Sequence, residues 1–319
     1  MITKQTVHEK LGQLHCPLPT PFGEDGSLDL AGVRKNLRYL LQNNVPVIAF
    51  PVGVAEICSI TLKEYQQLVE LAVEEINGRA IMIAGAAWYT AHICVEMAQI
   101  CERAGVDMLM VDAPANPPAA DDEDTYIHFR TIADSTHLPI AVYQGFCKRP
   151  LTMELLKRLV EIPNVVAYKE LPYNPTYFYN VARRFGDTIA LVMGRRGEGE
   201  LRQIFYREAG ANGYWSALML ISPELAWEHW NAWKARDYET IRQICKRTAP
   251  FFDLYSDMYD EFFKTPSISN LLTYKMAMDA VGLAGGFCRS PYPRPTEAMR
   301  KQVKQALDEI GIVSVTLEG

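Results

Sequence analysis

Positive charge is scarce in this sequence compared with negative charge. The 32 Lys and Arg residues are outnumbered by 38 Asp and Glu residues, so the formal net charge is −6 and the pI is near 5.6. A broad basic surface that would attract a nucleic-acid backbone or an anionic membrane is therefore not expected. A small anionic substrate is not excluded, because a few local cations can hold a carboxylate inside a net acidic protein.

Paired cysteines and long apolar runs are also missing. The 7 cysteines are scattered and contain no C-x-x-C pair of the kind found in zinc and redox motifs, so we expect no metal site and reduced thiols. No apolar run approaches the roughly 18 residues needed to span a bilayer, and the N-terminal residues lack the apolar core of a signal peptide. We therefore expect a cytoplasmic protein with no membrane partner.

A glycine-rich phosphate turn after the first strand, typical of open doubly wound sheets, is absent as well. The dense glycine cluster at Gly194–Gly199 follows the seventh predicted strand and has the wrong spacing for a dinucleotide fingerprint. An open dinucleotide-binding sheet is therefore disfavoured.

What the sequence does contain, from about residue 12 to 235, is an alternation of short apolar runs with amphipathic stretches of helical length. This alternation is typical of successive βα units around a parallel sheet, and the runs are near-continuously apolar, as buried parallel strands are. Eight strands are predicted: Gln13–Leu18, Val45–Phe50, Ala80–Gly85, Asp107–Asp112, Pro139–Tyr143, Val165–Lys169, Ile189–Met193 and Gly213–Ala217. The pattern predicts a (β/α)8 TIM barrel.

Helix signals occur between the strands and continue after the last one. Helices are predicted at Asp29–Asn43, Leu62–Ile76, Ala91–Ala104 and Glu198–Glu208, and Thr61 with Glu64 forms a capping box for the second of these. After about residue 235 the strands stop, and helical patterns follow at 237–262, 268–281 and 295–309. We predict a barrel domain over 1–235 and a C-terminal helical extension over 236–319.

Two polar side chains stand at the ends of neighbouring predicted strands. Active sites of such barrels form at the C-terminal ends of the strands. Alternation places Val165, Ala167 and Lys169 on one face, and Ala141 with Tyr143 on the matching face of the strand before. If the alanines face the interior, Lys169 and Tyr143 lie side by side; a surface lysine and a core tyrosine are the alternative.

A lysine among barrel apolar residues loses hydration, which lowers its pKa and frees the amine to attack a ketone. Imine catalysis requires such an amine, and Tyr143 would move protons to and from the carbinolamine.

At these residues the chain resembles the dihydrodipicolinate synthase and N-acetylneuraminate lyase family of class I aldolases and dehydratases. The similarity covers most of the length. Its motifs are Thr20-Pro-Phe22 with Asp25-Gly-Ser-Leu-Asp29, then Ile140-Ala-Val-Tyr143, Val165-Val-Ala-Tyr-Lys-Glu170 and Gly210-Ala-Asn-Gly-Tyr-Trp-Ser216. The resemblance implies that Lys169 is the Schiff-base lysine, that Tyr143 relays protons and that the chain forms a homo-oligomer, either a dimer or a tetramer.

Two departures from the family pattern concern the proton relay. The family's loop after the second strand carries two threonines, whereas this chain reads Val52-Gly-Val-Ala-Glu56, so Val54 stands where a hydroxyl normally joins the relay. The family's Pro-Tyr-Tyr segment after the fourth strand reads Pro114-Ala-Asn116 here. These departures predict that the chain is not a dihydrodipicolinate synthase; the alternative is that water or Asn116 substitutes for the missing hydroxyls.

The remaining candidate substrate contacts follow the same loops. The backbone amides of Gly53, Val54 and Ala55 can bind the substrate carboxylate, and Glu56 keeps the register of this loop. Lys148 or Arg149 falls near the family's distal arginine. Arg195 and Arg196 either clamp a far carboxylate or pair with Glu198 and Glu200, and Trp215 either contacts substrate or fills the core.

Other polar residues have simpler interpretations. His128 and His229 lie in helical stretches without ligand-spaced partners and are interpreted as structural. The acidic run at 121–124 is interpreted as a helix start favoured by the helix dipole.

The sequence thus predicts a cofactor-free Schiff-base lyase that acts on a small 2-oxo acid. Either a pyruvate-releasing aldolase or a 2-keto-3-deoxy sugar acid dehydratase fits, because both pass through the same imine. The alternative from another class is a catalytically idle barrel that binds a 2-oxo acid as a sensor or scaffold.

Overall fold

The computed structural model describes residues 2–114, 118–144, 151–170, 174–194, 199, 201–262, 266–312 and 314. Its strands form one closed parallel barrel in the order β1 to β8, in which each strand pairs with the next and β8 pairs with β1. The strands are β1 (Leu14–Pro17), β2 (Val47–Ala49), β3 (Ile81–Ala86), β4 (Met108–Asp112), β5 (Ile140–Tyr143), β6 (Val165–Glu170), β7 (Ala190–Met193) and β8 (Gly213–Trp215). The predicted (β/α)8 barrel is confirmed.

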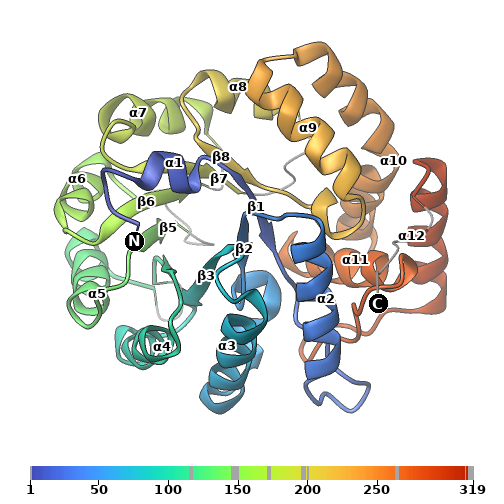
Figure 1. Ribbon diagram of the computed structural model, residues 1–319, viewed down its shortest axis with the longest axis horizontal. Coiled ribbons are helices and arrows are strands. Elements are labelled where there is room, and N and C mark those ends of the chain that lie inside the picture. Colours follow the sequence, from blue (N-terminus) through green and yellow to red (C-terminus); the bar gives the residue numbers. More distant parts are fainter. Residues whose placement is uncertain are drawn as a thin grey trace.

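Helices surround the barrel (Figure 1). The surrounding helices are α2 (Leu30–Gln42), α3 (Leu62–Ile76), α4 (Ala91–Ala104), α5 (Asp122–Asp134), α6 (Met153–Glu161), α7 (Pro175–Phe185), α8 (Arg202–Glu208) and α9 (Pro223–Ala235), and a short helix α1 (Val7–Leu11) precedes β1. The Thr61 hydroxyl accepts from the Glu64 amide while the Glu64 carboxylate accepts from the Thr61 amide, so the predicted capping box at α3 is present.

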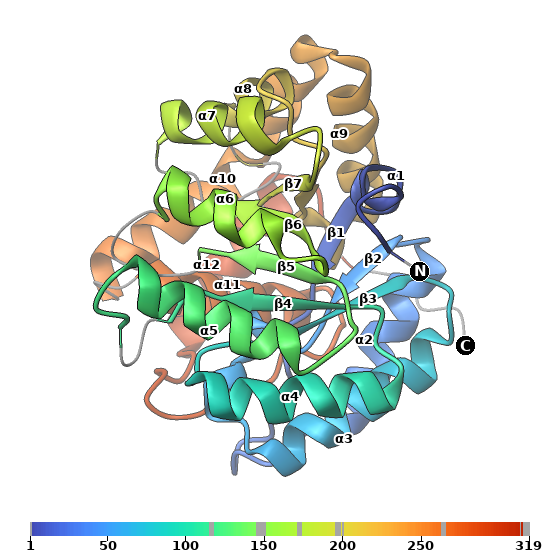
Figure 2. The same ribbon diagram turned by 90° about the vertical axis from the view of Figure 1, so that its left-hand side faces the viewer.

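Three further helices follow the barrel: α10 (Tyr238–Phe262), α11 (Pro266–Ala280) and α12 (Glu297–Glu309). Figure 2 shows α11 and α12 on the side toward which the β5 arrow points, which is the end of the barrel where the strands terminate. α9 ends at Ala235, the last residue of the predicted barrel domain. The division into two domains at this residue stays a prediction.

Two concentric apolar clusters hold the barrel together. The outer one lies between strands and helices. The inner one fills the barrel and is built partly from small residues; it includes Ala49, Met108, Met110, Ala141, Tyr143, Ala167, Ala190, Val192 and Trp215. Alternate residues of the strands supply the two clusters, as expected for strands covered on both faces, except in β6, where the neighbours Val166 and Ala167 both belong to the inner cluster. Inward alanines leave room for the long side chains at the strand ends.

The opposite end of the barrel is closed by α1, a helix that the sequence analysis did not predict. Its Val7 and Leu11 pack into the inner cluster. His15 on β1 is hydrogen-bonded through Nε2 to the Leu11 carbonyl at 3.0 Å. Substrate access is therefore directed to the C-terminal ends of the strands.

Among the described residues, no helix is both long enough and apolar enough to cross a bilayer.

Candidate active site

Lys169 and Tyr143 meet at the ends of adjacent strands, as predicted. In the β5–β6 register Tyr143 is paired with Lys169. The Lys169 Nζ atom lies 4.0 Å from the centre of the Tyr143 ring and 3.4 Å from the centre of a Trp215 ring, and the lysine is only 7% exposed. The surface-lysine alternative is therefore wrong for this side chain.

The predicted facing of Val165 is wrong. Val165 packs in the outer cluster, whereas Val166 and Ala167 both pack in the inner one. A register irregularity between Ile140 and Ala141 pairs Ala141 with Ala167 and skips one residue of β6. Such an irregularity breaks strict alternation, so the first half of β6 has the opposite phase to that predicted.

Burial changes the ionisation of the lysine. Loss of hydration lowers the pKa of Lys169 to about 7, and the nearby Asp112 carboxylate opposes this by favouring the ammonium. A neutral amine at this position is consequently accessible near neutral pH, which meets the first chemical requirement for attack on a ketone.

Asp112, at the end of β4, is a site residue that the sequence analysis missed. It is 6% exposed, and burial raises its pKa to about 7 while the charge of Lys169 lowers it. The alternation that located Lys169 would also have located Asp112. In Met108-Leu-Met-Val-Asp112, residues 108, 110 and 112 share one face of the strand, so Asp112 points into the barrel with Met110 at the strand end.

The loop after β2 forms one wall of the site. Its first turn is a 3₁₀ helix over Gly53–Ala55, and the Thr20 hydroxyl fixes this turn by donating to the Ala55 carbonyl at 2.8 Å. The Ala55 amide donates to the Val52 carbonyl at 2.8 Å, so it is already used inside the turn. The expectation that Ala55 binds a carboxylate is therefore revised, and the amides of Gly53 and Val54 remain as candidate donors.

Glu56 differs from the expected substrate contact. It is fully buried, its Oε1 atom accepts from Lys275 Nζ at 2.5 Å, and its Oε2 atom accepts from the Arg289 amide at 2.9 Å. Lys275 is also fully buried and belongs to α11. Both carboxylate oxygens of Glu56 are engaged by the C-terminal segment, so this residue holds the loop instead of binding substrate.

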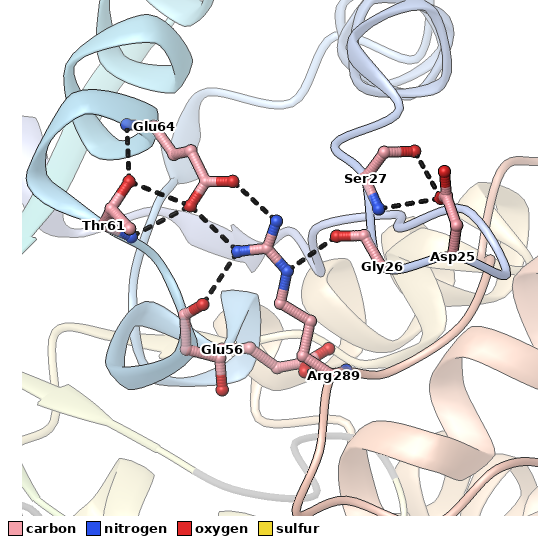
Figure 3. A network of polar contacts seen from close by, with 8 residues as sticks. Asp25, Gly26, Ser27, Glu56, Thr61, Glu64 and Arg289 are labelled. Carbon is pink, nitrogen blue, oxygen red and sulfur yellow. Dashed lines mark hydrogen bonds and ion pairs between the residues drawn. The ribbon is translucent and has the colours of Figure 1, made fainter.

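Arg289 ties the same loop to two other segments (Figure 3). Its guanidinium donates to both carboxylate oxygens of Glu64, at 2.9 and 2.6 Å, and to the carbonyls of Ser59 and Gly26. This bidentate contact lowers the pKa of Glu64 to about 2, with the Thr61 hydrogen bonds adding to the effect. The wall formed by Gly53–Ala55 is therefore fixed from behind by ion pairs.

A cavity of about 70 Å³ opens above the lysine. It is lined by Val52, Gly53, Val54, Trp88, Met110, Tyr143, Lys169, Trp215, Leu271 and Tyr292. Val54 and Tyr143 thus face one space, and the C-terminal segment contributes Leu271 and Tyr292 to it. Trp215 lies inside the barrel, whereas Tyr214 lies outside it and is hydrogen-bonded to His229 Nδ1 at 2.7 Å.

Two further predictions, for His229 and for the acidic run at 121–124, concern structural roles. His229 is buried with Tyr214 as its partner, which supports a structural role. Asp121 caps α5 by accepting from the Asp124 amide, so the acidic run is a helix start.

Asn116, Lys148, Arg149, Arg195 and Arg196 lie outside the described residues. Within the described residues, no group of three or more His, Cys, Asp or Glu side chains is arranged to hold a metal ion.

The fold and site define a (β/α)8-barrel protein with a buried lysine at the end of its sixth strand. The model of the dihydrodipicolinate synthetase family matches residues 10–310, and the chain belongs to this family. A 4-hydroxy-tetrahydrodipicolinate synthase of Archaeoglobus fulgidus is 28% identical over 298 residues, which are 92% of this chain and 96% of the relative.

Solved structures agree with this assignment. The dihydrodipicolinate synthase from Bacillus clausii superposes with a TM-score of 0.83 at 25% identity, covering 94% of this chain and 98% of the other. The N-acetylneuraminate lyase from Mycoplasma synoviae has a TM-score of 0.80 at 19% identity, with coverage of 94% and 98%. At 19% identity, the similarity to the lyase shows a shared fold and nothing more.

Proposed function

We propose that the protein is a Schiff-base-forming lyase that acts on a small 2-oxo acid, with Lys169 as its nucleophile. The observation that carries the proposal is the position of Lys169: its amine is buried against Tyr143 and Trp215 at the floor of the cavity. Burial lowers the pKa of this amine to about 7, so a neutral nucleophile is available. Family membership supports the same chemistry.

The substrate carboxylate is proposed to bind the amides of Gly53 and Val54, which places the keto carbon over Lys169. The amine attacks this carbon, and Tyr143 moves protons between the nitrogen and the oxygen that leaves as water. The resulting iminium draws electrons from the neighbouring bond, so the imine itself serves as the electron sink and no cofactor is required.

The second half of the substrate distinguishes the two candidate reactions. Asn116, Lys148 and Arg195 are proposed to contact it, and it is either the aldehyde fragment of an aldolase substrate or the sugar chain of a 2-keto-3-deoxy acid that loses water. A screen of 2-keto-3-deoxy acids, read out by pyruvate release and by water loss separately, distinguishes the two reactions.

We further propose that the reaction is not that of the named synthase relatives. Val54 and Tyr143 line the same cavity, and the valine side chain has no hydroxyl that could join a proton relay at this position. The proposed homo-oligomer, dimer or tetramer, and the cytoplasmic location rest on family resemblance and on the sequence, and light scattering of the purified protein tests the first.

Borohydride trapping tests the lyase proposal. Pyruvate and cyanoborohydride should reduce an imine on the wild-type protein, and the intact mass should rise by one pyruvate-derived group. A catalytically idle barrel that only binds a 2-oxo acid would keep its mass. The exposed Lys157 on α6 provides a control, since Lys157→Ala should trap pyruvate like the wild type.

A further inference from the structure

Asp112 is a buried carboxyl group without the usual compensation. Its Oδ1 atom is buried and has no hydrogen-bond partner among the described residues. Burial of a polar atom without a partner destabilises the folded protein, and buried unpaired carboxylates are rare for this reason. A group retained at such a cost on the inward phase of β4 calls for a functional explanation.

The register places Asp112 in one row with the two residues already assigned to the reaction. Asp112 pairs with Tyr143 across β4 and β5, and Tyr143 pairs with Lys169 across β5 and β6. Asp112 and Lys169 interact electrostatically, yet within the described part of the chain neither is held in an ion pair. The carboxyl group is therefore close enough to interact electrostatically with the amine, although the two do not form an ion pair.

We propose that Asp112 stores the proton that Lys169 must lose before it attacks, and that it returns this proton through Tyr143. Asp112 would thereby replace the hydroxyl relay that is interrupted at Val54. This inference rests on the proposed Schiff-base function and adds the group that manages its proton. Asp112 acts through Lys169 and Tyr143 and is not itself a contact of the cavity.

The step balances without a further reactant. The Lys169 ammonium gives one proton to the Asp112 carboxylate by way of the hydroxyl of Tyr143, which stands between the two in the strand register, and the nitrogen lone pair forms the C–N bond as the C=O π pair moves to oxygen. A second nitrogen-bound proton moves to this oxygen, and the stored proton reaches it by way of the Tyr143 hydroxyl. The oxygen leaves as water with its bonding pair, the nitrogen lone pair forms the C=N bond, and the Asp112 carboxylate is regenerated.

The ionisation of the pair supports this exchange. Burial raises the pKa of Asp112 and lowers the pKa of Lys169, so both lie at about 7 and a proton moves between them at little cost. Four other titratable groups lie next to the pair. They are His15 on β1, Cys94 on α4, His128 on α5 and Tyr143 on β5. Burial lowers the pKa of His15 and His128 to about 4, so neither carries charge near pH 7.

The test is the rate of pyruvate trapping in Asp112→Asn, measured at pH values on both sides of 7. A purely electrostatic Asp112 would raise the pKa of Lys169, so its removal would leave more free amine at low pH and trapping would speed up. A proton store predicts the opposite: trapping slows by roughly 10²-fold at every pH, although the free amine is more abundant. Asp112→Asn keeps the size of the side chain, and acetylation of Lys169 by an amine-reactive probe reports the free amine independently.

Two controls complete the experiment. Asp112→Ala should be equally slow and should regain rate when formate supplies a small carboxylate, whereas Asp134→Asn, on the exposed face of α5, should behave like the wild type. Slow trapping without recovery by formate, or trapping in Asp112→Asn as fast as in the wild type, overturns the inference. A wild-type protein that traps no pyruvate refutes the lyase proposal instead, so the two failures are distinguishable.

Discussion

At the scale of single residues, Lys169 is subject to two opposing effects. The faces of Tyr143 and Trp215 attract a cation at 4.0 and 3.4 Å, and such contacts contribute about 0.5–2 kcal/mol each. Enclosure removes water from the ammonium, and this effect is the larger one because the pKa falls to about 7. The rings therefore hold the amine in place while burial keeps it nucleophilic.

Tyr143→Phe tests the residue beside the lysine. The variant keeps the ring against Lys169 and removes only the hydroxyl, so binding of pyruvate should remain while turnover falls by roughly 10²–10⁴. Steady-state kinetics with the substrate found in the 2-keto-3-deoxy acid screen provide the measurement, with KM and kcat compared separately. An unchanged kcat would remove Tyr143 from the mechanism.

At the scale of elements, the strands and most helices could be predicted because periodicity and caps are local. The eight strands lie within two residues of their predicted bounds, and the α3 capping box is where Thr61 and Glu64 put it. The phase of Val165 could not be predicted, because the β5–β6 irregularity depends on how two strands meet. The role of Glu56 was equally hidden, since its partner Lys275 is 219 positions away and no local pattern links them.

Val54→Thr tests whether the β2 loop and Tyr143 face each other. The two side chains have nearly the same size, so the substitution should fit. A buried hydroxyl without a partner would lower the free energy of unfolding by roughly 1–3 kcal/mol. Tyr143 lines the same cavity, however, and its hydroxyl can accept a hydrogen bond from the new threonine. We expect the melting temperature to change little. A large decrease in Val54→Thr with none in Val54→Ala would show that the loop and Tyr143 do not meet.

Glu64→Gln tests the ion pair that fixes this loop from behind. The pKa of Glu64 is lowered from 4.5 to about 2, so the unfolded chain binds its proton more readily than the native one. Its contribution to stability is therefore fully present above about pH 4.5 and is lost as the pH falls through about 2. Urea unfolding between these pH values should depend less on pH in Glu64→Gln, and an unchanged dependence would contradict the assignment.

At the scale of the whole molecule, the C-terminal helices take part in building the site. α11 supplies Leu271 to the cavity and Lys275 to the loop beside it, and the connector between α11 and α12 supplies Tyr292 to the cavity. The sequence predicted these helices as an appendage to the barrel and gave no sign of this contribution. Side chains that converge from distant parts of the chain require the tertiary structure, whereas Lys169 and Tyr143 could be found because both stand at strand ends.

Condensation of pyruvate with aspartate semialdehyde separates this account from the activity of its named relatives. We expect no measurable synthase activity, because Val54 cannot pass a proton and Asn116 stands where the family has a tyrosine. A coupled assay beside an active synthase as positive control gives the answer. Efficient condensation would show that water or other groups complete the relay.

The most direct test of the central claim is to locate the reduced pyruvate adduct. After incubation with pyruvate and cyanoborohydride, peptide mass spectrometry should find the added group on Lys169, at the end of β6. In Lys169→Ala the adduct and turnover should disappear together while the thermal melt shows a folded protein, because loss of the lysine charge raises the pKa of the buried Asp112 and this acid then stays neutral. An adduct on another lysine, or trapping that persists in Lys169→Ala, would contradict the claim.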